Sequence, residues 1–525
     1  MTFDLPADYW QNLTVSRQDI EYLQNYLFET ETPLTGQEMA AVLINERIRR
    51  ERQAADAQKK SNGKVYLPQE QYKAGDRLVF PALSWQKGEV RSVRPGNNPQ
   101  RPEFEVITVS MEDGSERLFA SKLADHPLNN PPEEPESVDI NPEAVIQTFG
   151  GDLARKIEAA LEDDDALVRI AGRWFPSALL VDINIGHLNL AEAILDVSGG
   201  EPMSTEALMK ELDLGAGVNP RLLEFSLNYA LQNDSRFDEV GPAGQVLWVL
   251  ERHEPEDVRT PPPYLRYAEV DYDRSGFTEQ MKRLEVELDD ELSPIEATAP
   301  ANGQVTICLT YPHWRAGTLP ISSRLRNFFP TAYESERVRF TLRDAVTNEV
   351  MPAWVVRKHR YVYGLRNWYV KNGLIPGGYI TLRQSKIPGE VLIEAKTHRA
   401  TRDWVRTVLA GTDGGLVFAI LKQEVACEYN ERMVIAVPDL KAVDLAWTQA
   451  AKSRQTLEQL VATNVRELSK LTPQGHVHAQ ELYSAVNILR RCPPGPLFDV
   501  LTKSKQFRHV GDLYYRLADT DLDEE

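Results

Sequence analysis

The sequence of 525 residues has only three cysteines and lacks any long apolar run. Cys308, Cys427 and Cys492 lie far apart and in no metal-ligand spacing, which argues against a disulfide framework and against a zinc finger. A transmembrane helix needs about 20 consecutive apolar residues, and the N-terminus lacks the basic and apolar regions of a signal peptide. We therefore expect a cytoplasmic protein without membrane contact, nucleoid-associated if it is bacterial.

The short motifs of common enzymes are also missing. The sequence has no phosphate-binding loop, no Gly-x-Ser-x-Gly elbow, no His-Glu-x-x-His and no paired Cys ligands. Glu394-Ala395-Lys396 has the Glu-x-Lys form used by many metal-dependent nucleases, but residues 377–388 before it contain no carboxylate to complete a metal site. The sequence therefore predicts a protein that is not an enzyme and that needs no metal or cofactor.

What the sequence does have is an uneven distribution of charge. The formal net charge of the whole chain is −19. Between residues 301 and 410, however, 17 Lys and Arg stand against 7 Asp and Glu, so this segment carries +10 and the remainder −29. A local positive field on an acidic protein concentrates polyanions, because each cation that neutralises a phosphate releases a counterion. The segment therefore points to nucleic acid.

The pattern within this basic segment is mainly that of strands. Short β-branched or aromatic runs are separated by Gly, Pro and Asn at residues 305–310, 337–343, 353–357, 379–383 and 390–395. Two short pieces, 322–328 and 365–372, are compatible with helices. Val338, Phe340 and Leu342 alternate with arginines, which predicts an apolar face and a guanidinium face. This order of elements suits a compact barrel.

These residues resemble the plant-type B-three DNA-binding pseudobarrel, relatives of which recognise DNA in some bacterial restriction enzymes. The matching blocks are residues 319–322 leading to 328–330, then 338–344, 354–356 and 364–380. Gly378 stands where the family has Asp, which alters one turn. The resemblance covers roughly a fifth of the chain and implies a seven-stranded pseudobarrel that binds double-stranded DNA.

Domains of this family hold the major groove with two arms. The resemblance places the first arm at His313, Trp314 and Arg315, and the second at Arg357, Lys358, His359, Arg360 and Tyr361. Arg reads guanine edges in a bidentate way, and Lys or His on a loop suits phosphates. The plainer alternative is a solvated basic loop. Four cationic or potentially cationic residues in a row favour DNA.

An internal repeat is the second feature that the sequence provides. Residues 153–176, 222–250 and 497–517 each read as a helix, a polar turn, Val or Ile, Gly and an aromatic strand, with a fainter copy at 63–68. The unit fits the third helix and wing of a winged helix. Residues 16–60 add two helical stretches, with a capping box from Thr35 to Glu38.

The copy from 188 to 250 is the clearest, and it resembles the HARE-type winged helix. That family is known from the delta subunit of bacterial RNA polymerase and from chromatin-associated proteins. The matching residues are 202–208 and 234–241, and Leu190, Ala193, Ile194 and Val197 are expected to form a buried helical face. The third helix carries one Arg against one Glu, so we expect this copy to bind protein rather than DNA.

Residues 73–119 read as short strands that begin with Gly-Asp and continue with Gly-x-Val-x-x-Val, similar to small Tudor or KOW-type barrels. Trp85 at the rim is either a ligand platform or a packing residue.

The fold class is therefore multidomain α+β, with winged-helix repeats, a small barrel and a pseudobarrel. The predicted domains are 1–70 winged-helix-like, 71–128 barrel, 129–143 linker, 144–187 partial winged helix, 188–255 HARE-like, 256–300 linker and acidic helix, 301–400 pseudobarrel, 401–518 helical with a winged-helix unit, and 519–525 acidic tail.

The function expected from these features is non-enzymatic binding of double-stranded DNA, in transcription regulation or in a nucleoid or chromatin context. One alternative is a scaffold that binds RNA polymerase or another protein through the winged-helix units. A second is the recognition subunit of a restriction or defence nuclease.

Overall fold

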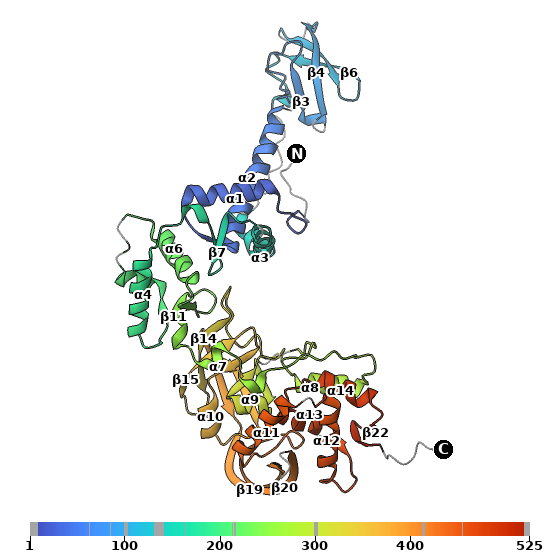
Figure 1. Cartoon of the computed structure of the whole chain (residues 1–525). Helices are drawn as coiled ribbons and strands as arrows, with labels where there is room; N and C mark the ends of the chain where they lie inside the picture. The colour runs from blue at the N-terminus through green and yellow to red at the C-terminus, as the bar shows by residue number, and fades with distance from the viewer. Residues whose placement is uncertain are drawn as a thin grey trace. The chain divides into compact units, whose positions relative to one another are not determined.

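The computed structural model shows a multidomain α+β protein (Figure 1). It describes residues 9–518 except 62, 84–85, 99–102, 131–140, 163, 213, 215–216, 299–302, 412–414 and 454. The chain divides into two compact units, one of Met1–Val181 with Asn219–Leu222 and one of Asp182–Val218 with Leu223–Glu525. Trp85 and the acidic tail lie outside the described residues. No helix among those residues has the length and apolar character that crossing a bilayer requires.

In the first unit, two segments far apart in sequence build one fold. α1 (Arg17–Thr30) starts at a capping box on Ser16, and Thr35 and Glu38 form the predicted box before α2 (Gly36–Ser61). β1 (Leu34–Thr35) pairs with β8 (Arg173–Pro176), which also pairs with β7 (Leu167–Ile170). α3 (Pro142–Leu161) packs into the same core. The predicted separate units 1–70 and 144–187 are thus two halves of one.

Between these halves in the sequence lies a five-stranded sheet that is antiparallel except for one pair of strands. Its strands follow the predicted positions, and β2 pairs with β3 in parallel, so residues 63–68 belong to this sheet and are not a wing. The core is formed by Tyr66, Leu78, Phe80 and Ile107. The strands are β2 (Lys64–Val65), β3 (Arg77–Phe80), β4 (Gln86–Pro95), β5 (Glu105–Met111) and β6 (Glu116–Ser121).

One arrangement occurs three times among the described residues: helix, short strand, helix, helix and hairpin, with the short strand paired to the last strand. The first unit contains one copy. The second copy is α4 (Ile185–Val197), β9 (Met203–Ser204), α5 (Thr205–Glu211), α6 (Pro220–Gln232), β10 (Phe237–Glu239) and β11 (Leu247–Leu250). The third is α12 (Leu457–Ser469), β21 (Val477–His478), α13 (Ala479–Leu489), α14 (Pro494–Lys503), β22 (Phe507–Gly511) and β23 (Tyr514–Leu517).

The buried face of α4 differs from the predicted one. Leu188, Ala191 and Leu195 point into the core, whereas Leu190 is 46% exposed and Val197 is 90% exposed. Both stripes are apolar at helical spacing, so periodicity alone could not choose between them. The prediction of a buried face through Leu190 and Val197 is therefore wrong, and the helix has a second, exposed apolar face.

The basic segment folds into a curled seven-stranded half-barrel in the order β12-β17-β18-β14-β15-β16-β13 (Figure 1). Along β14, Val338, Phe340 and Leu342 are buried and alternate with half-buried residues, as predicted. Residues 322–328 form turns rather than a helix. The elements are β12 (Gln304–Cys308), α9 (Tyr311–Ala316), β13 (Thr318–Pro320), β14 (Arg337–Asp344), β15 (Val350–Val356), β16 (Tyr361–Tyr363), α10 (Arg366–Lys371), β17 (Tyr379–Gln384) and β18 (Glu390–Ala395).

A long β-hairpin follows, at the start of the region 401–518 that the sequence predicted to be helical. β19 (Thr397–Ala410) pairs with β20 (Leu416–Cys427) along most of its length. Val405 and Val425 pack into the half-barrel core, while Val408 and Phe418 pack into the core of the C-terminal helices. The helical prediction is wrong here because pairing across the two strands lets apolar residues on one face enter the half-barrel core and those on the opposite face enter the C-terminal core.

After this hairpin the C-terminal part of the second unit is mainly helical, as predicted for the region 401–518. α11 (Leu440–Lys452) precedes the third repeated arrangement. α8 (Glu279–Leu288), the predicted acidic amphipathic helix, packs Met281 and Leu284 into this C-terminal core.

A buried ion cluster joins the segment after α8 to the half-barrel and to α13. The Arg491 side chain, 2% exposed, donates to Asp290 Oδ1 at 2.6 Å and to Glu291 Oε1 at 2.7 Å. Tyr483 Oη donates to Asp290 Oδ2 at 2.5 Å, and His313 Nε2 lies 3.2 Å from Glu291 Oε1. Because every charged member has an opposite charge beside it, the cluster can remain buried.

The substitution Arg491→Ala should destabilise the second unit strongly. It leaves two buried carboxylates without their cation, and breaking a buried pair from one side costs about 3–5 kcal/mol. The matched control is Arg490→Ala, one residue earlier and half-buried. Thermal unfolding should show a large fall in Tm for the first variant and a small one for the second. Equal falls would contradict the importance of this cluster.

Candidate nucleic-acid interface

The predicted second arm is an exposed turn between β15 and β16. Arg357, Lys358, His359 and Arg360 are all exposed, and Arg360 closes the turn in the left-handed region with φ of 54°. Four residues of cationic type thus lie together at one exposed place on the half-barrel. A tight hairpin fixes where these side chains start, which suits contact with a regular ligand surface.

The charges of this turn are only weakly neutralised. Arg357 Nη1 donates to the Ser335 carbonyl oxygen at 2.8 Å, and Arg360 Nη1 donates to the Glu291 carbonyl oxygen at 2.8 Å. Among the described residues neither guanidinium pairs with a carboxylate, and Lys358 Nζ lies 4.0 Å from Glu336 Oε1 in a largely exposed pair. The turn therefore keeps a net positive charge.

His359 and Tyr361 differ from this pattern. Burial, helped by the neighbouring Lys358, lowers the pKa of His359 below its usual 6.5, so the imidazole is neutral at neutral pH. Its ring stacks on Tyr361 at 6.5 Å between centroids. Tyr361 itself is fully buried and donates its hydroxyl to the Asp257 carbonyl oxygen at 2.6 Å. Tyr361 is thus a core residue in this structure, at the base of the turn.

The predicted first arm is not an exposed loop but the helix α9. His313 is 1% exposed, and its Nδ1 lies 2.9 Å from Thr318 Oγ1 while its Nε2 faces Glu291 in the buried cluster. Trp314 is half-buried and donates from Nε1 to the Leu374 carbonyl oxygen at 2.7 Å. Neither side chain is placed to reach a DNA backbone.

Arg315, the third residue of that arm, is bound by an acidic residue of α11. Its Nε and Nη2 donate to the two carboxylate oxygens of Asp444 at 2.9 and 2.5 Å, and its guanidinium lies 5.1 Å from the centre of the Tyr264 ring. This bidentate pair raises the pKa of Arg315 and lowers that of Asp444 against the opposing effect of burial. Both predicted arms therefore belong to one fold, but only the second is exposed. The side chains of the first are held by contacts within the fold.

Most other arginines of the half-barrel also have carboxylate partners. Arg337 Nε lies 2.8 Å from Asp238 Oδ2 and its Nη1 lies 2.8 Å from Glu254 Oε2. Arg339 pairs with Glu201 at 3.0 Å, and Arg343 pairs with Glu390 at 2.7 Å. The acidic partners of Arg337 and Arg339 come from outside the basic segment. The charge excess of residues 301–410 is thus partly paired with acids within the unit. The turn 357–360 groups exposed cations that lack a close carboxylate partner among the described residues, while Arg366 and Arg402 are exposed elsewhere in the segment.

The motif Glu394-Ala395-Lys396 is also committed to local contacts. Glu394 forms an ion pair with Arg383, and Lys396 Nζ lies 5.8 Å from the centre of the Tyr379 ring. Among the described residues, no cluster of His, Cys, Asp and Glu has the arrangement of a metal site.

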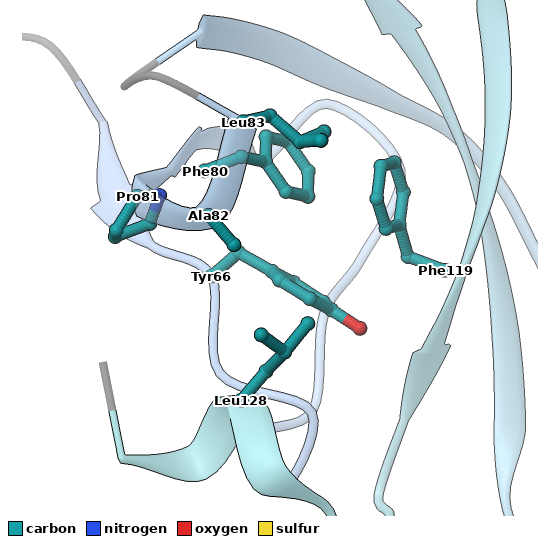
Figure 2. Close-up of a pocket in the computed structure, with 7 residues that line it drawn as sticks. All are labelled: Tyr66, Phe80, Pro81, Ala82, Leu83, Phe119 and Leu128. Carbon is teal, nitrogen blue, oxygen red and sulfur yellow. The ribbon is translucent and has the colours of Figure 1, made fainter. Parts of the chain in front are cut away.

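A separate feature is an aromatic pocket on the five-stranded sheet (Figure 2). The rings of Tyr66, Phe80 and Phe119 surround a cavity of about 80 Å³, with Phe80 and Phe119 stacked at 4.3 Å. Tyr66 donates its hydroxyl to the Ala120 carbonyl oxygen at 2.7 Å, so its polar group is already satisfied. The remaining lining residues are Pro81, Ala82, Leu83 and Leu128. This lining suits a small apolar group and not a phosphate.

Comparison with known proteins found no matching family model, no similar curated protein and no similar solved structure.

The contact between β10 and β14 contains buried carboxyl groups that sequence reasoning missed. Glu239 Oε1 accepts from the Gly241 and Leu247 N–H groups at 2.8 and 3.3 Å, and Oε2 accepts from the Ser335 hydroxyl. Burial raises the pKa of Glu239 from 4.5 to about 7 and that of Glu254 to about 9. No pattern in the sequence marks these acids, because their burial depends on residues 80 or more positions away.

The contact between β10 and β14 should weaken as pH rises towards 7. The folded Glu239 keeps a proton that the unfolded chain releases above its ordinary pKa of 4.5, so stability falls between pH 4.5 and about 7. In Glu239→Gln this contribution disappears, and the Tm of the variant should fall less than that of the wild type between pH 5 and about pH 7.5. Parallel Tm curves for the two proteins would contradict the assignment.

Proposed function

We propose that this protein is a non-enzymatic double-stranded DNA-binding protein that contacts DNA through the turn 357–360. One observation carries the proposal: Arg357 and Arg360 are exposed and bind only main-chain oxygens, whereas Arg315, Arg337 and Arg343 pair with carboxylates. A cation that the fold leaves without an acidic partner can neutralise phosphate without first breaking an ion pair.

The half-barrel is, in this proposal, a B-three-type pseudobarrel that reads DNA with one arm in place of two. The order strand, short helix, strands, short helix, strands supports that interpretation. His313 and Arg315 of α9 are bound by Glu291 and by Asp444. The first arm therefore helps to position the half-barrel and does not contact DNA. The protein would act in transcription regulation or in organising DNA, in the cytoplasm or on the nucleoid.

The three repeated arrangements are, in the same proposal, winged helices, with each closing hairpin as the wing, and the five-stranded sheet is a Tudor-like barrel. Their third helices offer few free cations: Arg155 of α3 pairs with Asp152, and Lys503 of α14 pairs with Asp499 at 2.8 Å. These units are therefore poor phosphate binders and better suited to protein partners.

A second candidate function is a scaffold for RNA polymerase or another protein. The observation that favours it is the exposed apolar face of α4, with Ile185 65% and Val197 90% exposed. Salt dependence separates the two functions, because only direct DNA binding loses affinity steeply as salt rises.

Replacing Arg357 and Arg360 with Ala should weaken binding to duplex DNA. If the arginines read bases, each substitution costs about 1–3 kcal/mol and relaxes sequence preference; if they contact phosphates, the slope of log K against log salt falls by about 0.9 per residue. Fluorescence anisotropy with labelled duplexes selected from a random pool measures both quantities.

The matched control is Arg343→Ala, which removes the same charge from a residue already paired with Glu390. It should change duplex affinity little. Equal affinities for the wild type and the Arg357/Arg360 double variant would contradict DNA binding by this turn.

A further inference from the structure

The β19–β20 hairpin carries a solvent-exposed tryptophan. Trp404 is 66% exposed, whereas the other tryptophans that the structure describes are buried or half-buried. A large aromatic ring held outward on a regular strand indicates a binding surface. Burying such a ring against a partner contributes more binding free energy than burying almost any other side chain.

The fold fixes this ring outward. Val405 and Val425 are locked into the half-barrel core, and Val408 and Phe418 into the C-terminal core. Successive side chains of a strand point to opposite faces, so Trp404 points away from the half-barrel core that its neighbour Val405 enters. Val408 and Phe418 lie further along the face of Trp404 and are covered by the C-terminal core, which leaves the ring on the uncovered part of that face. Its exposure is therefore a property of the hairpin and not of a loose side chain.

Cationic side chains flank the ring on both strands. Lys422 lies directly across from Trp404, and the exposed Arg402 precedes it by two residues on the same face. Arg399 and His398 are exposed at the irregular start of β19. Glu424, across from Arg402, is the acidic group on this face, while Asp403 accepts a hydrogen bond from Thr401 at 2.9 Å.

We propose that this face binds single-stranded nucleic acid, with one base stacked on Trp404 and with Arg402 and Lys422 on the neighbouring phosphates. Every base offers a π-face, so stacking on an exposed ring beside cations binds unpaired strands with little sequence preference. A protein partner would need an apolar surround with few charges. Around Trp404, Ile420, 42% exposed, is the apolar neighbour, and the other exposed neighbours on this face, Arg402, Lys422 and Glu424, are charged.

The hairpin starts at the opposite end of β14 from the turn 357–360. β18 runs parallel to β14 and ends beside Asp344, whereas the turn lies beyond Val356, which pairs with Arg337 at the other end of β14. The eight residues of β14 span about 25 Å. The proposal does not depend on duplex binding by the turn, and the two can fail independently.

The test is a titration of the full-length protein with an oligothymidylate of about 15 nucleotides at low salt, followed by tryptophan fluorescence and by anisotropy of a labelled oligonucleotide. The wild type should bind with quenching of its fluorescence. Trp404→Ala should bind about 5- to 150-fold more weakly, the effect of losing one stacked base. Trp404→Phe should keep most of the affinity and lose most of the quenching.

Two further variants make the result specific. Leu445→Ala removes an apolar side chain that is 65% exposed on α11 and should leave oligonucleotide binding unchanged. Lys422→Ala should reduce the salt slope by about 0.7, the value for one phosphate contact on a single strand. Circular dichroism and Tm should show that all four variants fold.

The proposal is overturned if the wild type does not bind the oligonucleotide at low salt, or if folded Trp404→Ala binds as well as the wild type. It is also overturned if the Arg357/Arg360 double variant loses oligonucleotide binding and Trp404→Ala does not, since the single strand would then occupy the turn.

Discussion

The buried cluster of Arg491, Asp290 and Glu291 is the constraint on which the second unit depends. A guanidinium taken out of water needs an opposite charge beside it, and here two carboxylates accept from Arg491 Nη2 while Tyr483 and His313 contact those carboxylates in turn. The cluster holds the segment after α8 between the half-barrel and α13. It also explains why α9 is buried, because His313 on that helix is one of its members.

The arrangement of charge shows what a sum over the sequence can and cannot predict. The excess of Lys and Arg in the half-barrel is real, but Arg315 faces Asp444 and Arg337 faces Asp238 and Glu254. These acids lie far away in sequence, and only the folded chain brings them to the arginines. Net charge therefore indicates the domain in which we place the candidate site, but only the fold shows which of its cations are paired with acids and which, like those of the turn 357–360, are left exposed.

Local patterns predicted many of the elements. The alternation along β14 and the capping box before α2 are visible because each depends on residues a few positions apart. The predictions that proved wrong depend on distant partners. Val405, Val408 and Leu409 have helix-like spacing, and only pairing with β20 makes them a strand. In α4, two apolar stripes compete, and the neighbouring helices decide which is buried. Of the predicted site, the exposed turn follows from its Arg and Lys run, whereas the burial of His313 and Tyr361 does not.

The five-stranded sheet interrupts the fold of the first unit between α2 and α3, which has a consequence for synthesis of the chain. β1 cannot find β8 until the ribosome has added the 115 residues that separate Ser61 from Pro176. At 5–20 residues per second this takes roughly 6–23 s. During that interval the apolar faces of α1 and α2 lack their final cover, while the inserted sheet, whose strands are contiguous, can already be complete. The five-stranded sheet can thus fold before the helices that precede it in the chain. α1 and α2, which are synthesised first, are the helices most in need of protection by a chaperone.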